Sequence, residues 1–411
     1  MNIIYLVHQF YPECWTGTEK FVFKISSALQ KTGQRVKVIT YSFYDNSFFD
    51  KKFGDILYKE FVYKGLPVLA FKNEIIDPEV HISIGERSMY NFARMVLEKE
   101  KPDLIHVGHP MRINDFIFCA RNLNISYLIT LTDFWLLCPS GILLDAQGNI
   151  CEGPNNGTTC RKNCPNFSSR FIENRLEAAR ELLFGASKVV SPSNFLAHLF
   201  KKELENLPVY IISHGMSYKT IKKNDKKYKK GDKIIFCYAG SLNRHKGVDF
   251  LIEALKKIES DKFILKIYGS GWDKEYLNKL YDMTKEDTRF EFHGVYDENK
   301  VGEVLSDIDV VIVPSIWYEN YPLILHEALA CGVPVVASNI GGMAEKIKDN
   351  INGFTFPAGN TEALNRILKN ILNDPCILNG LKENINKMFI PTVEQEALSY
   401  YESYVNILYN E

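Results

Sequence analysis

The sequence predicts an α/β protein with two Rossmann-like, doubly wound domains that face each other across a cleft. Short apolar segments alternate with amphipathic segments along the chain, which is the pattern of parallel sheets with crossover helices. A charged segment at 219–233 interrupts the alternation once, and the alternation then starts again. At 411 residues the chain is too long for one compact core, so two domains are expected.

The first domain is expected to span residues 1–218. It opens with a buried strand at 3–7 and a helix from about 18 to 31 that carries apolar residues on one face. Further short apolar strands are predicted at 36–40, 103–107, 127–131, 188–191 and 209–212. Residues 41–80 are rich in aromatic residues and Lys but lack clear periodicity. They are predicted to form an elaborated loop or a short hairpin.

Charge marks the boundary between the domains. Residues 219–233 hold eight Lys and two Asp and are expected to form a solvated linker, with contact to anionic lipid as the alternative. Upstream, residues 170–184 form an amphipathic helix. We interpret it as packed with one face exposed, and the alternative places it near a lipid-linked acceptor.

The second domain is expected over residues 234–390. It begins with a buried strand at 234–240 and repeats the alternation of strands and helices. Further strands are predicted at 263–268, 290–293 and 309–313, with helices starting near 248, 273 and 298. A last helix, rich in Tyr, is expected at about 392–409.

Composition excludes several classes of function. The chain is 46% hydrophobic and 24% charged, with a formal net charge of -1 at pH 7, which argues against a dedicated nucleic-acid binder. No apolar run approaches the roughly 18 residues needed to cross a bilayer. The start of the chain lacks the features of a signal peptide. A cytoplasmic protein is therefore expected, with weak association at a membrane surface left open.

The segment from Pro314 to Gly342 carries the most specific signal. A buried strand at 309–313 precedes a polar loop with Glu319, and a short helix with Glu327 follows, before a second strand at 335–338. Ligands of open parallel sheets bind at the carboxyl ends of the strands. A helix start offers N–H groups to phosphate, and a carboxylate just inside the helix can accept hydrogen bonds from ribose hydroxyls. The segment therefore predicts a nucleotide site.

Seven residues separate the two glutamates, and the second is followed by ALACGVPVVA. This block resembles the donor-site signature of retaining, nucleotide-sugar-dependent glycosyltransferases, in particular glycosyltransferase family 4, which has the two-domain GT-B fold. The resemblance implies that Glu319 lies near the transferred sugar and that Glu327 binds the nucleotide ribose. It also implies that the terminal segment 391–411 packs back on the first domain. It covers nearly the whole chain and is strongest from about 234 to 360.

Other strand-end residues match the family in part. Lys246 matches the Lys of the family pattern, and a cation there can neutralise a diphosphate leaving group, with an ordinary surface lysine as the alternative. Ser241 stands where the family often has Arg, so Arg244 is the candidate replacement. The remaining predicted donor contacts are Gly17, Gly269, Val295, Tyr321 and Leu323.

Two of the candidates belong to the first domain. Gly17 lies in the loop before the first helix and permits close backbone approach, although a simple N-cap at Thr16 or Thr18 explains the loop equally well. Asp133 ends a buried strand and is a candidate for contact with the acceptor or the sugar. Its alternative role is to cap the next turn. Relatives often have His-Asp here, whereas this chain has Thr132 before the Asp.

Four of the nine cysteines lie in an insert at about 136–166. They are Cys138, Cys151, Cys160 and Cys164, separated by twelve, eight and three residues. In a cytosolic enzyme this cluster suits a structural zinc better than a disulfide framework, and the metal would staple a loop on the acceptor side. An iron–sulfur cluster and unbound thiols are the alternatives.

The sequence thus predicts a nucleotide-sugar-dependent, hexosyltransferase-type glycosyltransferase of polysaccharide or glycoconjugate synthesis. It would transfer a sugar to a glycan or lipid-linked acceptor with retained anomeric configuration. Glu319, Lys246 and Asp133 are the predicted catalytic residues, and no catalytic metal is expected. One alternative is a nucleotide-sugar epimerase of the same fold, for which a clear acid/base pair is lacking. The other is a non-catalytic glycosyltransferase-like binding protein, which the departures at Thr132 and Ser241 leave open.

Overall fold

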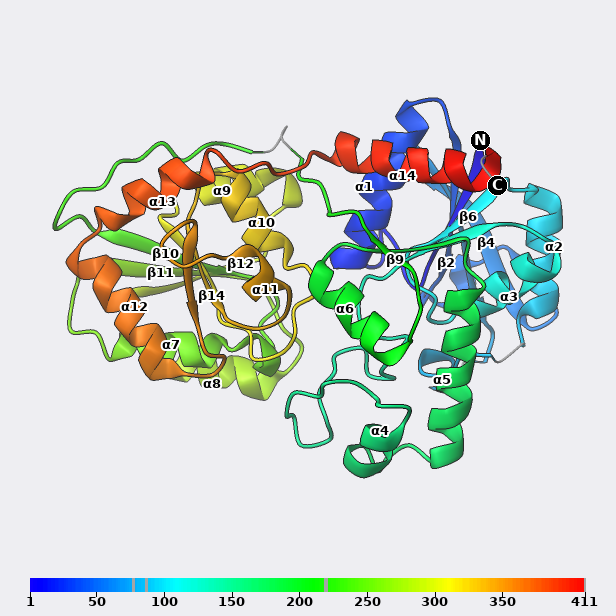
Figure 1. Ribbon diagram of the computed structural model, residues 1–411, viewed down its shortest axis with the longest axis horizontal. Helices are drawn as coiled ribbons and strands as arrows, with labels where there is room; N and C mark the ends of the chain where they lie inside the picture. Colours follow the sequence, from blue (N-terminus) through cyan, green and yellow to red (C-terminus); the bar gives the residue numbers. More distant parts are fainter. Residues whose placement is uncertain (76–77, 86–87, 218–220, 410–411) are drawn as a thin grey trace. The chain divides into compact units, whose positions relative to one another are not determined.

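The computed structural model describes residues 1–75, 78–85, 88–217 and 221–409. The chain forms two compact units (Figure 1). Unit 1 comprises Met1–Gly215 and Val393–Glu411, and unit 2 comprises Met216–Thr392. Each unit is a mostly parallel sheet covered by helices, so the expected α/β class with two Rossmann-like halves is confirmed. Among the described residues, no helix is both long and apolar enough to cross a bilayer.

Unit 1 is built on a nine-stranded sheet of order β3-β4-β5-β2-β1-β6-β7-β8-β9. Its strands are β1 Asn2–Val7, β2 Arg35–Tyr41, β3 Lys51–Phe53, β4 Ile56–Tyr63, β5 Leu66–Asn73, β6 Leu104–Val107, β7 Tyr127–Thr130, β8 Lys188–Ser191 and β9 Val209–Ile211. The strands from β5 to β9 run parallel, and β3 and β4 add an antiparallel edge. The strand order reverses at β1, which lies between β2 and β6.

Helices cover both faces of this sheet. They are α1 Gly17–Lys31, α2 Tyr90–Glu100, α3 Asn114–Asn122, α4 Thr158–Asn163, α5 Ser169–Phe184, α6 Asn194–Glu203 and α14 Val393–Tyr409. Alternate residues of β1, including Tyr5 and Val7, form a core with α1 and α14, which lie side by side (Figure 1). On α2 and α3, Phe92 and Phe116 pack against Phe71 of β5.

A buried polar network fastens α14 to the sheet. The Tyr404 hydroxyl lies 2.8 Å from the Tyr5 hydroxyl and 2.5 Å from His106 Nδ1. His106 Nε2 lies 2.8 Å from the Thr130 hydroxyl, which lies 3.0 Å from the Tyr400 hydroxyl. Burial lowers the pKa of His106 to about 3, so the imidazole is neutral. Each hydrogen bond in this series polarises and strengthens the next one, as is typical of buried networks.

Residues 41–80 contain more regular structure than a loop. β4 and β5 pair antiparallel over eight residues each, around a turn at Lys64 and Gly65 in which both φ angles are positive. β5 then pairs parallel with β2 and becomes a full member of the main sheet. The hairpin is thus longer than the short one expected, and its aromatic side chains belong to the core of the unit.

Unit 2 is built on a fully parallel six-stranded sheet of order β12-β11-β10-β13-β14-β15. Its strands are β10 Ile234–Ala239, β11 Phe263–Tyr268, β12 Phe290–Gly294, β13 Val310–Val313, β14 Val335–Ser338 and β15 Gly353–Phe356. Counted within the unit, this is the order 3-2-1-4-5-6 of a dinucleotide-binding Rossmann sheet. The order reverses between β10 and β13, and the crevice at such a point is where these sheets bind ligands.

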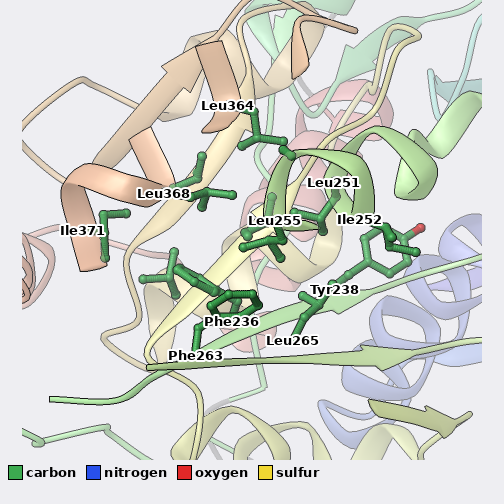
Figure 2. Packing of buried hydrophobic residues seen from close by; sticks show 14 of the residues in the cluster. Phe236, Tyr238, Leu251, Ile252, Leu255, Phe263, Leu265, Leu364, Leu368 and Ile371 are labelled. Atoms are coloured by element: carbon green, nitrogen blue, oxygen red, sulfur yellow. The ribbon is translucent and has the colours of Figure 1, made fainter. Parts of the chain in front are cut away.

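Two helical layers enclose the sheet of unit 2. The helices are α7 Val248–Lys256, α8 Lys274–Thr284, α9 Val301–Ser306, α10 Leu323–Ala330, α11 Gly341–Lys346, α12 Thr361–Asn373 and α13 Ile377–Ile385. On one face, Leu255 of α7 and Leu368 of α12 pack over Phe236 of β10 (Figure 2). On the other face, Cys237 and Val311 belong to a core shared with α9 and α10.

The charged segment before β10 lies along unit 2. Asn224 and Tyr228 are buried, and the Tyr228 hydroxyl donates to Asp309 Oδ1 at 2.8 Å. Lys226 Nζ lies 2.9 Å from both carboxylate oxygens of Asp309. Part of the segment expected to be a solvated linker is therefore anchored to the end of the sheet.

Candidate active site

The reversal point of the unit 2 sheet brings the loops after β10 and β13 into backbone contact. Gly247 has a φ of +69°, and a Cβ at this position would lie 2.2 Å from the Pro314 carbonyl oxygen. The Ile316 N–H donates to the His245 carbonyl at 2.9 Å. Glycine is required at residue 247 because it permits both the left-handed conformation and this close approach.

These two loops join Lys246 to Glu319. Lys246 Nζ lies 2.6 Å from Glu319 Oε1, and the same oxygen accepts from Ser315 Oγ at 2.7 Å and Trp317 Nε1 at 3.0 Å. The Glu319 residue is only 8% exposed. Burial acts to raise the pKa of Glu319, but the charge of Lys246 and the three hydrogen bonds together hold it below its ordinary value. The site therefore contains a buried carboxylate paired with a half-buried ammonium group.

Two aromatic rings complete the surroundings of Lys246. Lys246 Nζ lies 4.8 Å from the centre of the Trp317 ring, and the His245 ring packs edge-on against that ring, also at 4.8 Å. Burial, and then the charge of Lys246, lower the pKa of His245 to about 4. His245 is therefore neutral near pH 7, and Lys246 supplies the positive charge.

The start of α11 supports the backbone of the Glu319 loop. The Gly342 N–H donates to the Glu319 carbonyl at 2.7 Å. A Cβ on Gly341 would lie 2.7 Å from that carbonyl oxygen, and a Cβ on Gly342 would lie 2.1 Å from the Asn320 carbonyl oxygen. Because both residues are glycines, the start of α11 can pack directly against the backbone of the loop that carries the predicted sugar-binding carboxylate.

The end of β11 lies between the ends of β10 and β12. Gly269 has a φ of +140°, and its missing Cβ would lie 1.8 Å from the Gly240 carbonyl oxygen. The Gly269 N–H donates to the Gly294 carbonyl at 2.8 Å. Val295 follows directly and is 65% exposed. Gly269 is thus required by the packing of the strand ends, whereas Val295 is accessible.

The start of α10 carries the other predicted donor contacts. Leu323 is the first residue of the helix and is half-buried. The Tyr321 ring stacks on the His326 ring with centres 3.6 Å apart. Glu327 is half-buried, and its charge adds to burial in raising the pKa of Tyr296. Glu327 therefore lies near Tyr296, which follows the end of β12.

Arg244 forms ion pairs with the start of α8. Its Nε lies 2.8 Å from Asp273 Oδ2, and its Nη2 lies 2.8 Å from Glu275 Oε2. Among the described residues these are its ion-pair partners, so the structure does not bring Arg244 to the Lys246–Glu319 pair. A role as a second phosphate clamp would require these two bonds to break.

The predicted contact at Gly17 lies in unit 1, at the exposed start of α1. The Thr16 N–H and hydroxyl both donate to Glu19 Oε2, at 2.5 and 2.6 Å, so the capping alternative is realised in the structure. A Cβ on Gly17 would meet no atom within 4 Å. The backbone here is consequently open to approach by other molecules.

Asp133 also lies in unit 1, directly after β7. Its Oδ1 accepts from the Trp135 N–H at 2.8 Å, and its Oδ2 accepts from His109 Nε2 at 2.9 Å. The Met111 N–H donates to His109 Nδ1 at 3.2 Å, which places the His109 proton on Nε2. Capping and a polar contact thus coexist at Asp133, with one carboxylate oxygen used for each.

The four clustered cysteines are all free thiols. Burial, and then the charges of the other three, raise the pKa of Cys160 to about 12. Within the described ranges, however, no group of three or more His, Cys, Asp or Glu is placed to hold a metal ion. The thiols do not form a ready-made zinc site in this conformation.

Three residues of these sites received no role from the sequence. Ser315 and Trp317 fall within the motif that identified Glu319, but their bonds to its carboxylate depend on how the loop folds back. His109 follows β6 as Asp133 follows β7, and β6 and β7 are neighbours. The position of a His directly after a buried parallel strand was the signal that could have identified it.

Comparison with known proteins agrees with this fold. Residues 220–388 match the family model described as Glycosyl transferases group 1. The matched residues lie within the second unit, Met216–Thr392. The match includes Lys246, Glu319 and Glu327.

Curated relatives match over part of their length. An uncharacterized glycosyltransferase of Methanocaldococcus jannaschii is 29% identical over 177 residues, which cover 42% of this chain and 45% of the relative. The lipopolysaccharide 1,2-N-acetylglucosaminetransferase of Salmonella typhimurium is 29% identical over 189 residues, covering 42% and 50%. The chain thus spans about half the length of these relatives.

Solved structures match over the whole chain. The Anabaena protein HepE, solved in complex with UDP and glucose, superimposes with a TM-score of 0.70 at 17% identity, covering 98% of this chain and 99% of HepE. Sucrose-phosphate synthase from Thermosynechococcus elongatus superimposes with a TM-score of 0.71 at 18% identity, covering both chains completely. At this level of identity the likeness establishes the fold.

Proposed function

We propose that this protein is a retaining glycosyltransferase that moves a sugar from a nucleoside diphosphate sugar to an acceptor hydroxyl. The observation that carries the proposal is the Lys246–Glu319 pair at the reversal point of the sheet, within the matched glycosyltransferase domain. Breaking a glycosyl–phosphate bond leaves negative charge on the phosphate, and a preorganised cation stabilises it. The complexes of HepE with UDP and with UDP-glucose support a nucleotide sugar as the donor.

Each donor-site residue has a distinct proposed role. Lys246 neutralises the departing diphosphate, which would compete with Glu319 for the ammonium group. Glu319 orients the sugar: three donors converge on its Oε1, so Oε2 is the oxygen proposed to accept from a sugar hydroxyl. Glu327 accepts hydrogen bonds from the ribose.

The acceptor is proposed to be a hydroxyl of a glycan or of a lipid-linked sugar. The name of the Salmonella relative, which acts on lipopolysaccharide, supports this class. Asp133 is the proposed acceptor contact, because His109 and the Trp135 N–H hold its carboxylate in a fixed orientation. Membership of glycosyltransferase family 4 and a place in polysaccharide synthesis belong to the same proposal.

A transfer assay tests the proposal. UDP-, GDP- and ADP-linked hexoses are offered with glycan acceptors, and the anomeric configuration of the product is determined by NMR. We expect retention of configuration and a loss of about 10²-fold in turnover for Glu319→Gln. The matched control is Glu362→Gln, which removes a carboxylate of an exposed Lys–Glu pair in the same unit. An inverted product, or equal turnover of the two variants, would contradict the proposal.

The cysteine cluster carries a separate structural proposal. We propose that Cys138, Cys151, Cys160 and Cys164 bind zinc once the thiols close in from their present positions. The spacing, the absence of disulfides among the described residues and the mutual effect on pKa support it. Metal analysis should find about one zinc per chain in the purified protein and less in Cys160→Ser. Metal-free protein that remains folded and unchanged by added zinc would refute it.

A further inference from the structure

The sheet of unit 1 has a reversal point of its own. β1 lies between β2 and β6, and the loops that follow β1 and β6 meet at the carboxyl end of the sheet. Arg112, after β6, donates from Nη1 to the carbonyl of His8, after β1, at 3.0 Å. Because ligands of doubly wound sheets bind at such points, this corner of unit 1 is a second candidate for a site.

Arg112 is held in an unusual conformation. Its φ is +64°, in the left-handed region that residues other than glycine seldom adopt. Its Nε donates to His81 Nδ1 at 2.7 Å, and its guanidinium lies 4.6 Å from the centre of the Phe43 ring. Backbone strain of this kind concentrates at ligand-binding positions, where the surrounding contacts maintain it.

The charge of Arg112 has no direct counter-ion in the part of the chain that the structure describes. Among the described residues, no carboxylate oxygen lies within 4.0 Å of its guanidinium nitrogens. The nearby Glu13 accepts from the Ser42 hydroxyl, and Glu19 accepts from Thr16. Burial lowers the pKa of Arg112 to about 10, so the group remains positively charged at neutral pH. A partly desolvated cation without a paired anion is unfavourable, and a bound anion would relieve it.

Further polar groups at this corner are available to a ligand. A guanidinium has five N–H donors, and the bonds to His8 and His81 use two of them. The Nδ1 atom of His8 is buried and lacks a hydrogen-bond partner among the described residues. Such an atom indicates a missing partner, because buried polar groups are nearly always hydrogen-bonded.

A short series of contacts joins Arg112 to the proposed acceptor contact. Arg112 bonds to the backbone of His8, and the His8 ring lies 4.1 Å from the His109 ring. His109 in turn donates to Asp133. The cation, the unpartnered His8 nitrogen and the oriented carboxylate therefore belong to one cluster at the carboxyl ends of β1, β6 and β7.

We propose that Arg112 anchors the anionic group of an acceptor, a carboxylate or a phosphate, while Asp133 faces its reacting hydroxyl. The planar guanidinium fork suits both anions, which it can bind through two parallel hydrogen bonds. The assignment of the ligand as an acceptor rests on the proposed glycosyltransferase function. The proposed role of Arg112 narrows the class of acceptor to a negatively charged sugar, such as a uronic acid or a sugar phosphate.

Binding measurements on the full chain test this inference. Isothermal titration uses methyl glucuronide as the carboxylate probe, glycerol 3-phosphate as the phosphate probe and methyl glucoside as the neutral probe. We expect one or both anionic probes to bind at least about tenfold more tightly than the neutral one. The probe that binds identifies whether the site accepts a carboxylate, a phosphate or both.

Variants locate the binding. Arg112→Met should weaken the anionic probe at least about tenfold, and Arg112→Lys should weaken it less, because charge is kept without the fork. Arg94→Met, at an exposed arginine of α2 in the same unit, is the control and should bind as the wild type does. Arg112→Met that binds like the wild type would overturn the inference.

Two further results distinguish a failure of this inference from a variant that does not fold and from a failure of the proposed donor site. If Arg112→Met does not fold, wild-type protein that binds the neutral probe as tightly as the anionic ones still overturns it. Nucleotide binding by unit 2 is measured on the same samples. Retained UDP, GDP or ADP binding without anion discrimination would refute the Arg112 site alone, whereas loss of all nucleotide binding in the wild type would refute the proposed function.

Discussion

Glu319 is the residue on which most of the proposed donor site depends. It is buried, ionised and bonded through one oxygen to Lys246, Ser315 and Trp317. Removing one partner of a buried ion pair leaves the other charge without compensation in the interior. The resulting loss of stability exceeds the net stabilisation that the intact pair provides. The stability of unit 2 and its chemistry are therefore coupled at the same carboxylate.

A double-mutant cycle measures that coupling. Lys246→Met should lower the free energy of unfolding by about 3 kcal/mol, because the buried carboxylate loses its cation. In Lys246→Met with Glu319→Gln, the loss should be smaller than the sum of the single losses by about 1 kcal/mol or more. Urea unfolding provides the free energies. The exposed pair Lys257–Glu362, treated in the same way, should show a coupling of less than about 1 kcal/mol.

The pH dependence of stability follows from the lowered pKa of Glu319. A carboxylate whose pKa is lower in the folded state adds stability above its unfolded value, here 4.5, and loses that contribution as pH falls through the folded value. The difference in unfolding free energy between wild type and Glu319→Gln should therefore stay constant from pH 8 to about pH 5 and shrink below that. Urea titrations across this range would contradict the assignment if the difference grew on acidification.

The sequence indicated the two central residues of the site, but it did not indicate the other side chains that bond to them. Lys246 was predicted from its match to the family pattern, and Glu319 from the resemblance of the block that holds Glu319 and Glu327 to the family's donor-site signature. The bonds from Ser315 and Trp317 could not be found, since they form only when the loop after β13 folds back on itself. Arg244 was proposed as a phosphate clamp from its position in the loop, but the carboxylates that hold it come from α8, 29 and 31 residues further along the chain.

At the scale of elements, glycine contacts set the spacing between the two loops of the donor site. In Gly247→Ala the new methyl group would meet the Pro314 carbonyl, and the φ of +69° would become strained. We expect a loss of about 2 kcal/mol or more in unfolding free energy and a weakened Lys246–Glu319 site. Chemical unfolding and nucleotide binding both report the change.

Gly380→Ala is the matched control for that substitution. Gly380 lies within α13, and a Cβ there would meet no atom within 4 Å. Alanine should stabilise this helix by roughly 0.5–1 kcal/mol, because it restricts the unfolded chain and favours the helix. If Gly247→Ala were as stable as Gly380→Ala, the close approach of the two loops would not hold the site.

Elements with strong periodicity were predicted closely. The strands at 263–268 and 335–338 have the expected bounds, and the first helix begins one residue earlier than expected. β4 and β5 were missed as long strands because β4 is half-buried and β5 is buried at nearly every position, so no alternation of apolar and polar residues marks them. Their tight turn, Lys64-Gly65, contains a glycine that could have located the hairpin in the sequence.

At the scale of the whole molecule, the chain passes from unit 1 to unit 2 and returns with α14. The helix is held by the hydroxyl network of Tyr5, His106 and Tyr404. Tyr404→Phe would leave the other two polar groups without this partner inside the core. We expect unit 1 to lose about 1–3 kcal/mol of stability.

Hydrogen exchange followed by mass spectrometry measures each unit separately in Tyr404→Phe. Peptides of unit 1 should exchange faster than in the wild type, while peptides of the unit 2 sheet should be unchanged. Tyr401→Phe, a half-buried tyrosine on the same helix, is the control. Equal acceleration in both units would show that the chain unfolds as one cooperative body and that the network is not specific to unit 1.

The central claim is that unit 2 binds the diphosphate of a nucleotide sugar through Lys246. We would measure it by isothermal titration of UDP, GDP and ADP into wild type, Lys246→Met and the control Lys257→Met, without added divalent metal. At least one nucleotide should bind the wild type and Lys257→Met equally, and about 10- to 100-fold more weakly to Lys246→Met, since a charged hydrogen bond contributes about 1.5–3 kcal/mol. Equal binding by all three proteins, or no binding by the wild type, would contradict the account.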